Sequence, residues 1–280
     1  MNLNFLANPM NAKEFLFSIF EQKPFFFPQN NSAYLQSIFC KADLDLYLSR
    51  DIPLADIRVV KSEGTIAPAL IARPGSAIVN IGAALDAFAS GYSITLHNIL
   101  GASHGLTALI RSLENSLLAR VEPNLYLTPE NSQGFKTHWD NHDVFILQVF
   151  GSKKWHLFAP IMILPNHSKV LEPSDSRNET WNGTLSAGDI LYIPRGVPHH
   201  AITTNESSCH VTLTISTQKN SHFLHYLLDD LVNSNIDLRR SLVTNNDSSP
   251  ALISKAVVEA LCSADNVEKK YKQYIGRYSK

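Results

Sequence analysis

The spacing of hydrophobic residues predicts helices in the first 50 residues of the chain. Asn11 and Glu14 have the spacing of a capping box, and the apolar residues that follow fall on one side of a helix. A second helical pattern runs from Ala33 to Leu48. Between the two, Pro24 and Pro28 interrupt the chain around three consecutive phenylalanines. Because proline does not continue a helix, we expect an extended, buried segment there.

From about Arg58 the pattern changes to that of short strands. The stretches from Ser76 to Ile81 and from Tyr92 to Leu96 are rich in β-branched residues, which favours strands. One further helix is expected between Ser103 and Leu118, where leucine and isoleucine recur at helical spacing.

The centre of the chain alternates between strand-like runs and turn residues. Strands are expected at 124–127, 144–150, 154–158, 189–193 and 209–216. The polar stretch from Asn166 to Asn182 is predicted to be a loop. Many short strands with regular turns favour an all-β barrel or a double-sheet jelly roll of the cupin type.

After Ser221 the pattern is helical again, with an apolar stripe, and Ser249 followed by Pro250 predicts the start of another helix. The expected fold class is therefore mainly β with flanking helices: a double-stranded β-helix followed by a C-terminal helical region. We expect residues 1–220 to form the β-rich domain with an N-terminal helical elaboration. Residues 221–280 are expected to form the helical region.

Composition excludes several classes of protein. A net charge of −1 over 280 residues gives no reason to expect nucleic-acid binding. Three widely separated cysteines without CxxC spacing argue against a disulfide framework and fit the reducing cytoplasm. The chain has no apolar run of about 18 residues, so no membrane span is expected.

The run His138-Trp139-Asp140 carries the candidate chemistry. In an extended strand residues i and i+2 point the same way, so His138 and Asp140 can reach one metal ion. A histidine after Pro194-Arg195-Gly196, on a distant segment, would complete one face of a six-coordinate site, the geometry of non-heme Fe(II) oxygenases. A lone His-x-Asp pair is more often an ordinary surface pair, so the distant histidine and the flanking strands favour the metal site. His199 and His200 compete for the third position, because neighbours on a strand face opposite sides.

Several motifs, in order and at the expected spacing, resemble the JmjC-type 2-oxoglutarate oxygenases, and in particular their ribosomal-oxygenase branch. The resemblance covers roughly residues 5 to 245. The matching stretches are Asn124 to Pro129, Gly134-Phe135, His138 to Asp140, Asp143 to Gln148, Gly151 to Trp155, Gly188 to Gly196, His199, His210 to Thr212 and Leu238 to Leu242.

The resemblance implies specific roles for individual residues. It makes His138, Asp140 and His199 the ligands of Fe(II), and so selects His199 over His200. It makes Lys153 the cation that pairs with the distal carboxylate of 2-oxoglutarate. It places three polar residues in the co-substrate pocket, with Thr214 as an alternative to the last because an insertion lies nearby: Asn124, Tyr126 and Thr212. His142, His200 and His210 are expected to be ordinary half-buried histidines, and Trp139 and Trp155 to be core residues.

The implied activity is hydroxylation of a side chain in a protein or peptide, with Fe(II) as cofactor and 2-oxoglutarate and O2 as co-substrates. Two alternatives remain open: an N-methyl-lysine demethylase of the same fold, and a non-enzymatic cupin that binds a metal.

The larger ribosomal oxygenases carry a winged-helix domain after their dimerisation helices, and the stretch after Leu242 is shorter than such a domain. The substrate is therefore expected to be either a ribosomal protein or a dedicated peptide. The apolar stripes beyond Ser221 need burial, which favours a homodimer.

Overall fold

The computed structural model describes residues 2–28, 32–171, 178–239, 257–258 and 264–277. It contains two compact units: one of residues 1–116 and 120–216, the other of residues 117–119 and 217–280. The helix predicted from Ser249 onward lies outside the described residues.

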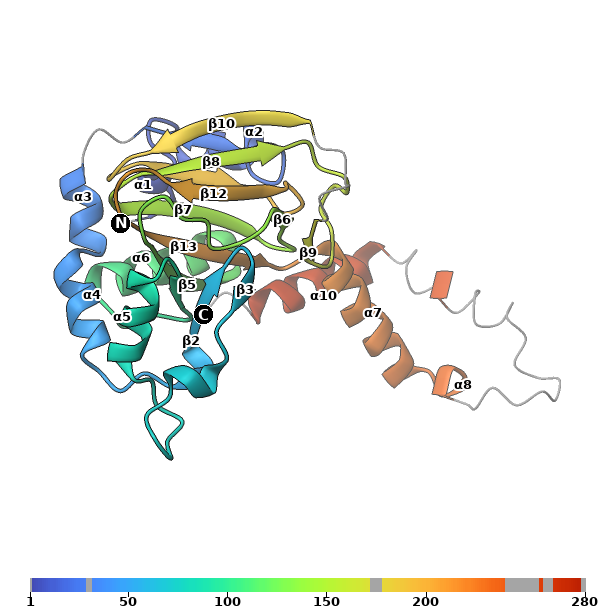
Figure 1. Ribbon diagram of the computed structural model, residues 1–280. Coiled ribbons are helices and arrows are strands. Elements are labelled where there is room, and N and C mark those ends of the chain that lie inside the picture. The colour runs from blue at the N-terminus through green and yellow to red at the C-terminus, as the bar shows by residue number, and fades with distance from the viewer. Residues whose placement is uncertain (1, 29–31, 172–177, 240–256, 259–263, 278–280) are drawn as a thin grey trace. The chain divides into compact units, whose positions relative to one another are not determined.

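Two sheets dominate the first unit (Figure 1). The larger has the order β1-β11-β7-β13-β5-β4-β2-β3, and the smaller has the order β10-β8-β12-β6-β9. The larger sheet contains β1 (Phe25–Phe27), β2 (Ile57–Lys61), β3 (Gly64–Thr65), β4 (Ser93–Leu96), β5 (Ala119–Thr128), β7 (Asp143–Phe150), β11 (Ile190–Ile193) and β13 (Ser208–Thr217). The smaller contains β6 (His138–Trp139), β8 (Lys153–Phe158), β9 (Lys169–Val170), β10 (Glu179–Leu185) and β12 (His199–Thr203). These sheets confirm the predicted mainly-β, jelly-roll class.

The core of the first unit includes a cluster contributed by both sheets. Because successive side chains of a strand point to opposite faces, alternate residues of β7 and of β8 reach the interior. The buried members of the cluster are Val144, Ile146, Trp155, Leu157, Leu185, Leu191, Ile193 and Val197. At roughly 25 cal/mol per Å² of apolar surface removed from water, such packing is the main stabilising term of the unit.

Aromatic packing joins the helix α2 (Ala12–Ser18) to residues of β7 and β11. The ring of Phe15 lies 5.4 Å from that of Phe145 and 5.0 Å from that of Tyr192. Asn11 caps α2 by accepting a hydrogen bond from the Glu14 amide at 2.9 Å, as its sequence predicts.

The predicted helix from 103 to 118 is confirmed as α6 (His104–Leu117), whose apolar face is buried. The stretch predicted as one helix from 33 to 48 is two helices, α3 (Ser32–Ile38) and α4 (Lys41–Leu48), because Cys40 is extended and caps α4. The remaining short elements of this unit are α1 (Leu3–Leu6), η1 (Leu54–Asp56) and η2 (Pro68–Ile71).

Two assignments from the sequence, one strand and one loop, are wrong. The predicted strand at 76–81 forms only isolated bridges at Ile78 and Val79, and Asn80 caps helix α5 (Ile81–Ala89). The predicted loop at 166–182 contains β9 and the start of β10. The sequence of β10 is polar, and so resembles a loop, because β10 is an edge strand whose alternate side chains are exposed.

The second unit contains α7 (Asn220–Ser234), α8 (Ile236–Arg239) and α10 (Ala264–Gly276). Aromatic rings join α7 to α10: Tyr274 lies 5.4 Å from both Phe223 and Tyr226. Lys270 and Asp230 add an ion pair at 2.8 Å. No helix of the described residues has the length and apolar character needed to cross a membrane.

A buried polar network ties the N-terminal segment to the larger sheet. The Tyr192 hydroxyl donates to Asp143 at 2.7 Å and accepts from the Glu21 amide at 2.8 Å. The Glu21 carboxylate pairs with Arg195 at 2.8 Å. Burial raises the pKa of Asp143 to about 6 even though Tyr192 donates to it.

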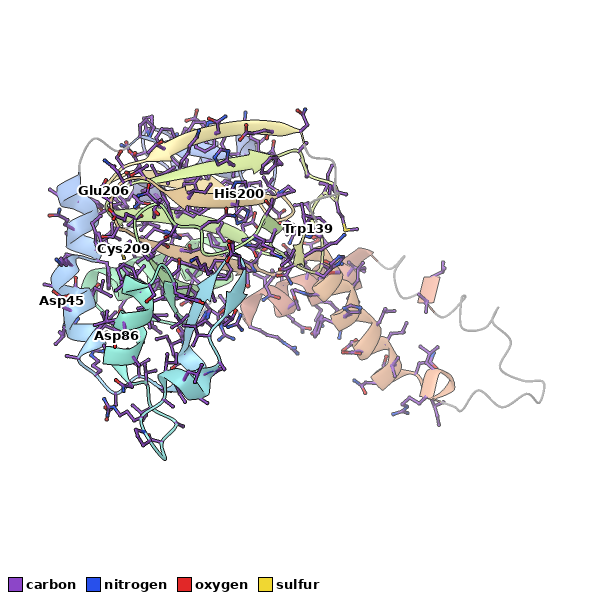
Figure 2. The ribbon with its side chains drawn as sticks, viewed as in Figure 1. Asp45, Asp86, Trp139, His200, Glu206 and Cys209 are labelled. Atoms are coloured by element: carbon purple, nitrogen blue, oxygen red, sulfur yellow. The ribbon has the colours of Figure 1, made fainter. Side chains whose placement is uncertain are left out.

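The unfolding free energy is predicted to depend on pH through Asp143. The folded protein keeps the Asp143 proton up to a higher pH than the unfolded chain does, so stability falls as the pH rises from about 4 to about 6. Asp143→Asn removes this contribution, which is about 3 kcal/mol because one pKa unit corresponds to roughly 1.4 kcal/mol. Denaturant unfolding at pH 4 and pH 7 measures the difference between variant and unmodified protein. Asp86→Asn, at an exposed position on α5 (Figure 2), is the control, and an unchanged pH profile in Asp143→Asn would contradict the prediction.

Candidate metal centre

Strand pairing brings the predicted metal ligands together. In the smaller sheet His138 of β6 lies directly opposite His199 of β12, and their rings are 4.6 Å apart. Asp140 follows β6 two residues after His138. One ligand atom from each of these three residues lies within 4.8 Å of the others, the only such group of three or more among the described residues.

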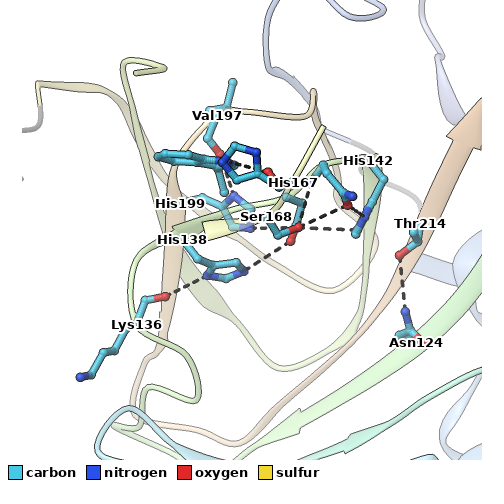
Figure 3. A network of polar contacts seen from close by, with 12 residues as sticks. Asn124, Lys136, His138, His142, His167, Ser168, Val197, His199 and Thr214 are labelled. Carbon is cyan, nitrogen blue, oxygen red and sulfur yellow. Dashed lines mark hydrogen bonds and ion pairs between the residues drawn. The ribbon is translucent and has the colours of Figure 1, made fainter. Parts of the chain in front are cut away.

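Backbone carbonyls fix the tautomer of both histidines. His138 Nδ1 lies 2.8 Å from the Lys136 carbonyl, and His199 Nδ1 lies 3.0 Å from the Val197 carbonyl (Figure 3). A carbonyl can only accept, so each Nδ1 carries the proton and each Nε2 keeps its lone pair. Both Nε2 atoms lie near the Asp140 carboxylate, at 4.0 Å for His138 and 3.8 Å for His199.

The ionisation states suit a divalent metal. Burial and the neighbouring His138 lower the pKa of His199 to about 4, so its imidazole is neutral near pH 7. Burial alone would raise the pKa of Asp140, but His199 and His138 hold it below its ordinary value. Metal binding needs neutral imidazoles and an ionised carboxylate, and the pKa shifts of His199 and Asp140 have the directions that this requires.

A turn at Gly196 holds the ligand segments in place. The Gly196 amide donates to the Asp140 carbonyl at 2.9 Å, three residues before His199. Gly196 has a φ of +87°, and a Cβ there would lie 2.5 Å from the Met162 carbonyl oxygen, so only glycine fits.

The structure separates His199 from its neighbour His200. His199 is buried beside Asp140, whereas His200 Nδ1 lies 3.0 Å from the Thr137 hydroxyl and its ring stacks on His156 at 4.8 Å. His142 lies at the edge of the centre, with Nε2 3.8 Å from Asp140.

A cavity with an empty volume of about 630 Å³ opens onto the metal centre. Residues from both sheets and from the β5–β6 connection line it, among them Tyr126, Thr128, Phe135, His138, Asp140, Lys153, Trp155, His199, His210 and Thr212.

Lys153 is the buried cation of this cavity. It begins β8, is 4% exposed, and donates from Nζ to the Thr128 hydroxyl at 2.8 Å. Burial lowers the pKa of Lys153 to about 7, and no carboxylate of the described residues offsets that effect. A buried amine with this environment is stabilised as a cation when it meets an anionic ligand.

The other predicted pocket residues divide into two groups. Tyr126 and Thr212 line the cavity, and burial together with Asp140 raises the pKa of Tyr126 well above its ordinary value. Asn124 is placed outside the lining residues: its side-chain oxygen accepts from the Asn98 amide at 3.0 Å and its nitrogen lies 3.4 Å from the Thr214 hydroxyl (Figure 3). Thr214 therefore contacts Asn124, while Thr212 faces the cavity.

Three residues that line the cavity were not predicted from the sequence to do so. Thr128 shares a strand face with Tyr126, and the alternation of β5 could have identified it. Trp155, expected in the core, and His210, expected to be half-buried, are both buried and both line the cavity. The same alternation puts Trp155 on the strand face of Lys153 and His210 on the strand face of Thr212, so it could have identified these two as well.

Comparison with known proteins supports this geometry. Residues 103–223 match the JmjC domain family, a segment that contains the metal centre and Lys153. The chain is 30% identical over 250 residues to "Ribosomal oxygenase 2" of Rattus norvegicus, covering 88% of this chain and 53% of that protein. It is 27% identical over 292 residues to "Bifunctional lysine-specific demethylase and histidyl-hydroxylase NO66" of Dictyostelium discoideum, covering 97% of this chain and 50% of the relative. The chain thus spans about half the length of these relatives.

Solved structures share the fold. YcfD, a ribosomal oxygenase from Escherichia coli determined in complex with cobalt and 2-oxoglutarate, superposes with a TM-score of 0.60 at 16% identity. The superposition covers 95% of this chain and 71% of YcfD. At this level of identity the likeness establishes the jelly-roll fold, and the sequence matches establish the relationship. Residues 103–223 therefore form a JmjC domain, and the chain is similar over most of its length to ribosomal oxygenases.

Proposed function

We propose that this chain is an Fe(II)- and 2-oxoglutarate-dependent oxygenase that hydroxylates a side chain of a protein or peptide. The observation that carries the proposal is the joint presence, in one cavity, of the His138–Asp140–His199 centre and the buried amine of Lys153. Two neutral imidazoles and one carboxylate suit Fe(II), and a 2-oxo dicarboxylate has one end for the metal and one for the lysine. YcfD, which has the same fold, was solved with cobalt and 2-oxoglutarate.

The roles of the residues follow from their positions. His138, Asp140 and His199 would hold the iron, and Lys153 with Thr128 would hold the distal carboxylate of 2-oxoglutarate. When bound, the iron with 2-oxoglutarate and O2 supplies an oxidant for an unactivated C–H bond, and succinate and CO2 are released. The aromatic walls exclude water, which strengthens the electrostatic contacts within the cavity.

The substrate is proposed from the relatives. Their names, ribosomal oxygenase and histidyl-hydroxylase, favour a protein side chain, either in a ribosomal protein or in a dedicated peptide. The second name also includes lysine-specific demethylase, so removal of an N-methyl group is the other candidate reaction. A cytoplasmic location, expected from cysteine usage, is part of the proposal.

Each ligand variant is predicted to abolish turnover by removing metal binding. His138→Ala, Asp140→Ala and His199→Ala should reduce succinate formation at least 100-fold, since a three-residue site that loses one ligand does not hold the metal in place. Succinate is measured with Fe(II), 2-oxoglutarate, O2 and candidate peptides from ribosomal proteins and cell extract. His200→Ala is the matched control, because it removes the adjacent histidine on β12 and should keep metal binding.

Mass spectrometry of the peptides distinguishes the reactions. A peptide that gains one oxygen supports hydroxylation, and loss of a methyl group with release of formaldehyde supports demethylation. Absence of both metal and 2-oxoglutarate binding in the unmodified protein would reject the oxygenase proposal in favour of a non-enzymatic cupin.

Substitution of Lys153 is predicted to act on co-substrate binding. Lys153→Met keeps the length of the side chain and removes the amine, so KM for 2-oxoglutarate should rise about 100-fold while metal affinity stays within about threefold of normal, as expected from loss of a buried charged hydrogen bond. Lys154→Met, the exposed neighbour, is the control. Equal KM values in Lys153→Met and the unmodified protein would contradict the proposed role.

We also propose that residues 221–280 form a helical domain that makes a homodimer. No residue of α7 is fully buried. Three apolar residues recur on it every four positions and stay exposed to solvent: Leu224 (49%), Leu228 (39%) and Val232 (39%). An apolar helical stripe of this kind is typical of a helix that packs against a partner.

The dimer is predicted to dissociate when its apolar stripe is charged. Leu228→Glu should shift the mass measured by light scattering from twice the chain mass to the 31.2 kDa of a single chain. Asp229→Ala, on the neighbouring position, should leave the mass unchanged. A single-chain mass for the unmodified protein at all concentrations would reject the homodimer.

A further inference from the structure

Six aromatic rings form a closed belt around the cavity. Consecutive centroid distances are 4.6 Å from His199 to His138, 6.1 Å to Phe135, 5.9 Å to Tyr126, 4.8 Å to His210, 5.5 Å to Trp155 and 6.0 Å back to His199. All six residues line the cavity. Two of the metal ligands, His199 and His138, are neighbours in the belt, and Tyr126, His210 and Trp155 are three consecutive members of it.

Two members of the belt carry a buried nitrogen without a hydrogen-bond partner among the described residues. They are Trp155 Nε1 and His210 Nδ1, and the two side chains are 5% and 3% exposed. An unsatisfied buried polar atom costs about 1–3 kcal/mol, so two of them in one cavity need an explanation. Stacking of His210 on Tyr126, at an interplanar angle of 7°, keeps its ring in place.

Both nitrogens can act as donors. The indole nitrogen of Trp155 is a donor only, and a neutral imidazole has one N–H to give. Burial, and secondarily the Lys153 charge, lowers the pKa of His210 well below its ordinary value, so the ring is neutral. A ligand that accepts hydrogen bonds satisfies Trp155 Nε1, and it satisfies His210 Nδ1 in the tautomer that carries its proton on that nitrogen.

The two donors lie on the side of the cavity that carries Lys153. Trp155 is two residues after Lys153 on β8, and both are buried, so the two side chains share the inner face about 7 Å apart along the strand. Lys153 has Thr128 as its hydrogen-bond partner among the described residues. A carboxylate has about four acceptor positions, more than Lys153 and Thr128 can use.

We propose that Trp155 Nε1 and His210 Nδ1 donate hydrogen bonds to the carboxylate that Lys153 holds, and so select a co-substrate with a distal carboxylate. This inference rests on the proposed 2-oxoglutarate site and adds two recognition residues to it. With both donors engaged, the carboxylate is bound by three N–H donors on rigid elements. A 2-oxo acid without the distal carboxylate leaves two buried donors unpaired and binds weakly for that reason.

Calorimetry on the Mn(II)-loaded protein tests the inference without turnover. Two ligands are titrated anaerobically: 2-oxoglutarate, and oxalate, which can chelate the metal but has no distal carboxylate. His210→Phe keeps a stacking ring and removes the nitrogen, His210→Asn keeps a polar group at the Nδ1 position, and Trp155→Phe removes the indole nitrogen. Two variants are matched controls: His97→Phe, which also removes a buried unpartnered imidazole nitrogen, and Trp181→Phe, at a tryptophan packed against the core outside the cavity.

Loss of one hydrogen bond to a charged group should weaken 2-oxoglutarate binding about 10-fold or more in His210→Phe and in Trp155→Phe. Oxalate affinity should stay within about twofold, His210→Asn should recover most of the 2-oxoglutarate affinity, and both controls should bind as the unmodified protein does. Recovery in His210→Asn separates a donor from a residue that only packs.

Three results would overturn the inference: unchanged 2-oxoglutarate affinity in both His210→Phe and Trp155→Phe, an equal loss of oxalate and 2-oxoglutarate affinity, or no recovery in a folded His210→Asn protein. Thermal unfolding checks the fold of each variant, and either donor can be tested alone if the other variant does not fold. If the unmodified protein binds Mn(II) but not 2-oxoglutarate, the proposed function fails rather than this inference about its recognition residues.

Discussion

The antiparallel pairing of β6 with β12 is the constraint on which the rest of the site depends. It sets His138 opposite His199, two residues that are far apart in the sequence, and the period of two along the chain adds Asp140. A slip of one residue would exchange His199 for His200, which contacts Thr137 and His156 instead. The Gly196 turn and the two backbone carbonyls that hold the histidine tautomers stabilise this register.

The interior of the jelly roll holds groups that are unfavourable there without a ligand. A buried lysine and two unpartnered nitrogens lower the stability of the protein by itself. The packed core and the aromatic belt offset that cost. A metal with a dicarboxylate ligand would satisfy both kinds of group, which explains why a stable fold retains them.

Much of the fold and of the site was predictable from the sequence, for identifiable reasons. Strands such as β7 and β13 are predictable because they consist of apolar or β-branched runs. The His-x-Asp spacing predicts two of the three metal ligands. β10 was missed because an exposed edge strand has the composition of a loop, and the segment before α5 was misassigned because the Asn80 cap outweighs the β-branched residues around it. The contacts of Asn124, Trp155 and His210 depend on pairing and packing between strands that are distant in the sequence, which local patterns do not encode.

The proposed function requires one cavity to bind a metal through three residues and a dicarboxylate through Lys153. The most direct test is the affinity for Mn(II), followed by the electron paramagnetic resonance signal of the free ion, with and without 2-oxoglutarate. Because the two ligands would share one site, 2-oxoglutarate should tighten Mn(II) binding, Mn(II) should tighten 2-oxoglutarate binding by the same factor, and Lys153→Met should remove most of that coupling. Independent binding of the two ligands, or Mn(II) binding that survives loss of His199, would contradict the account.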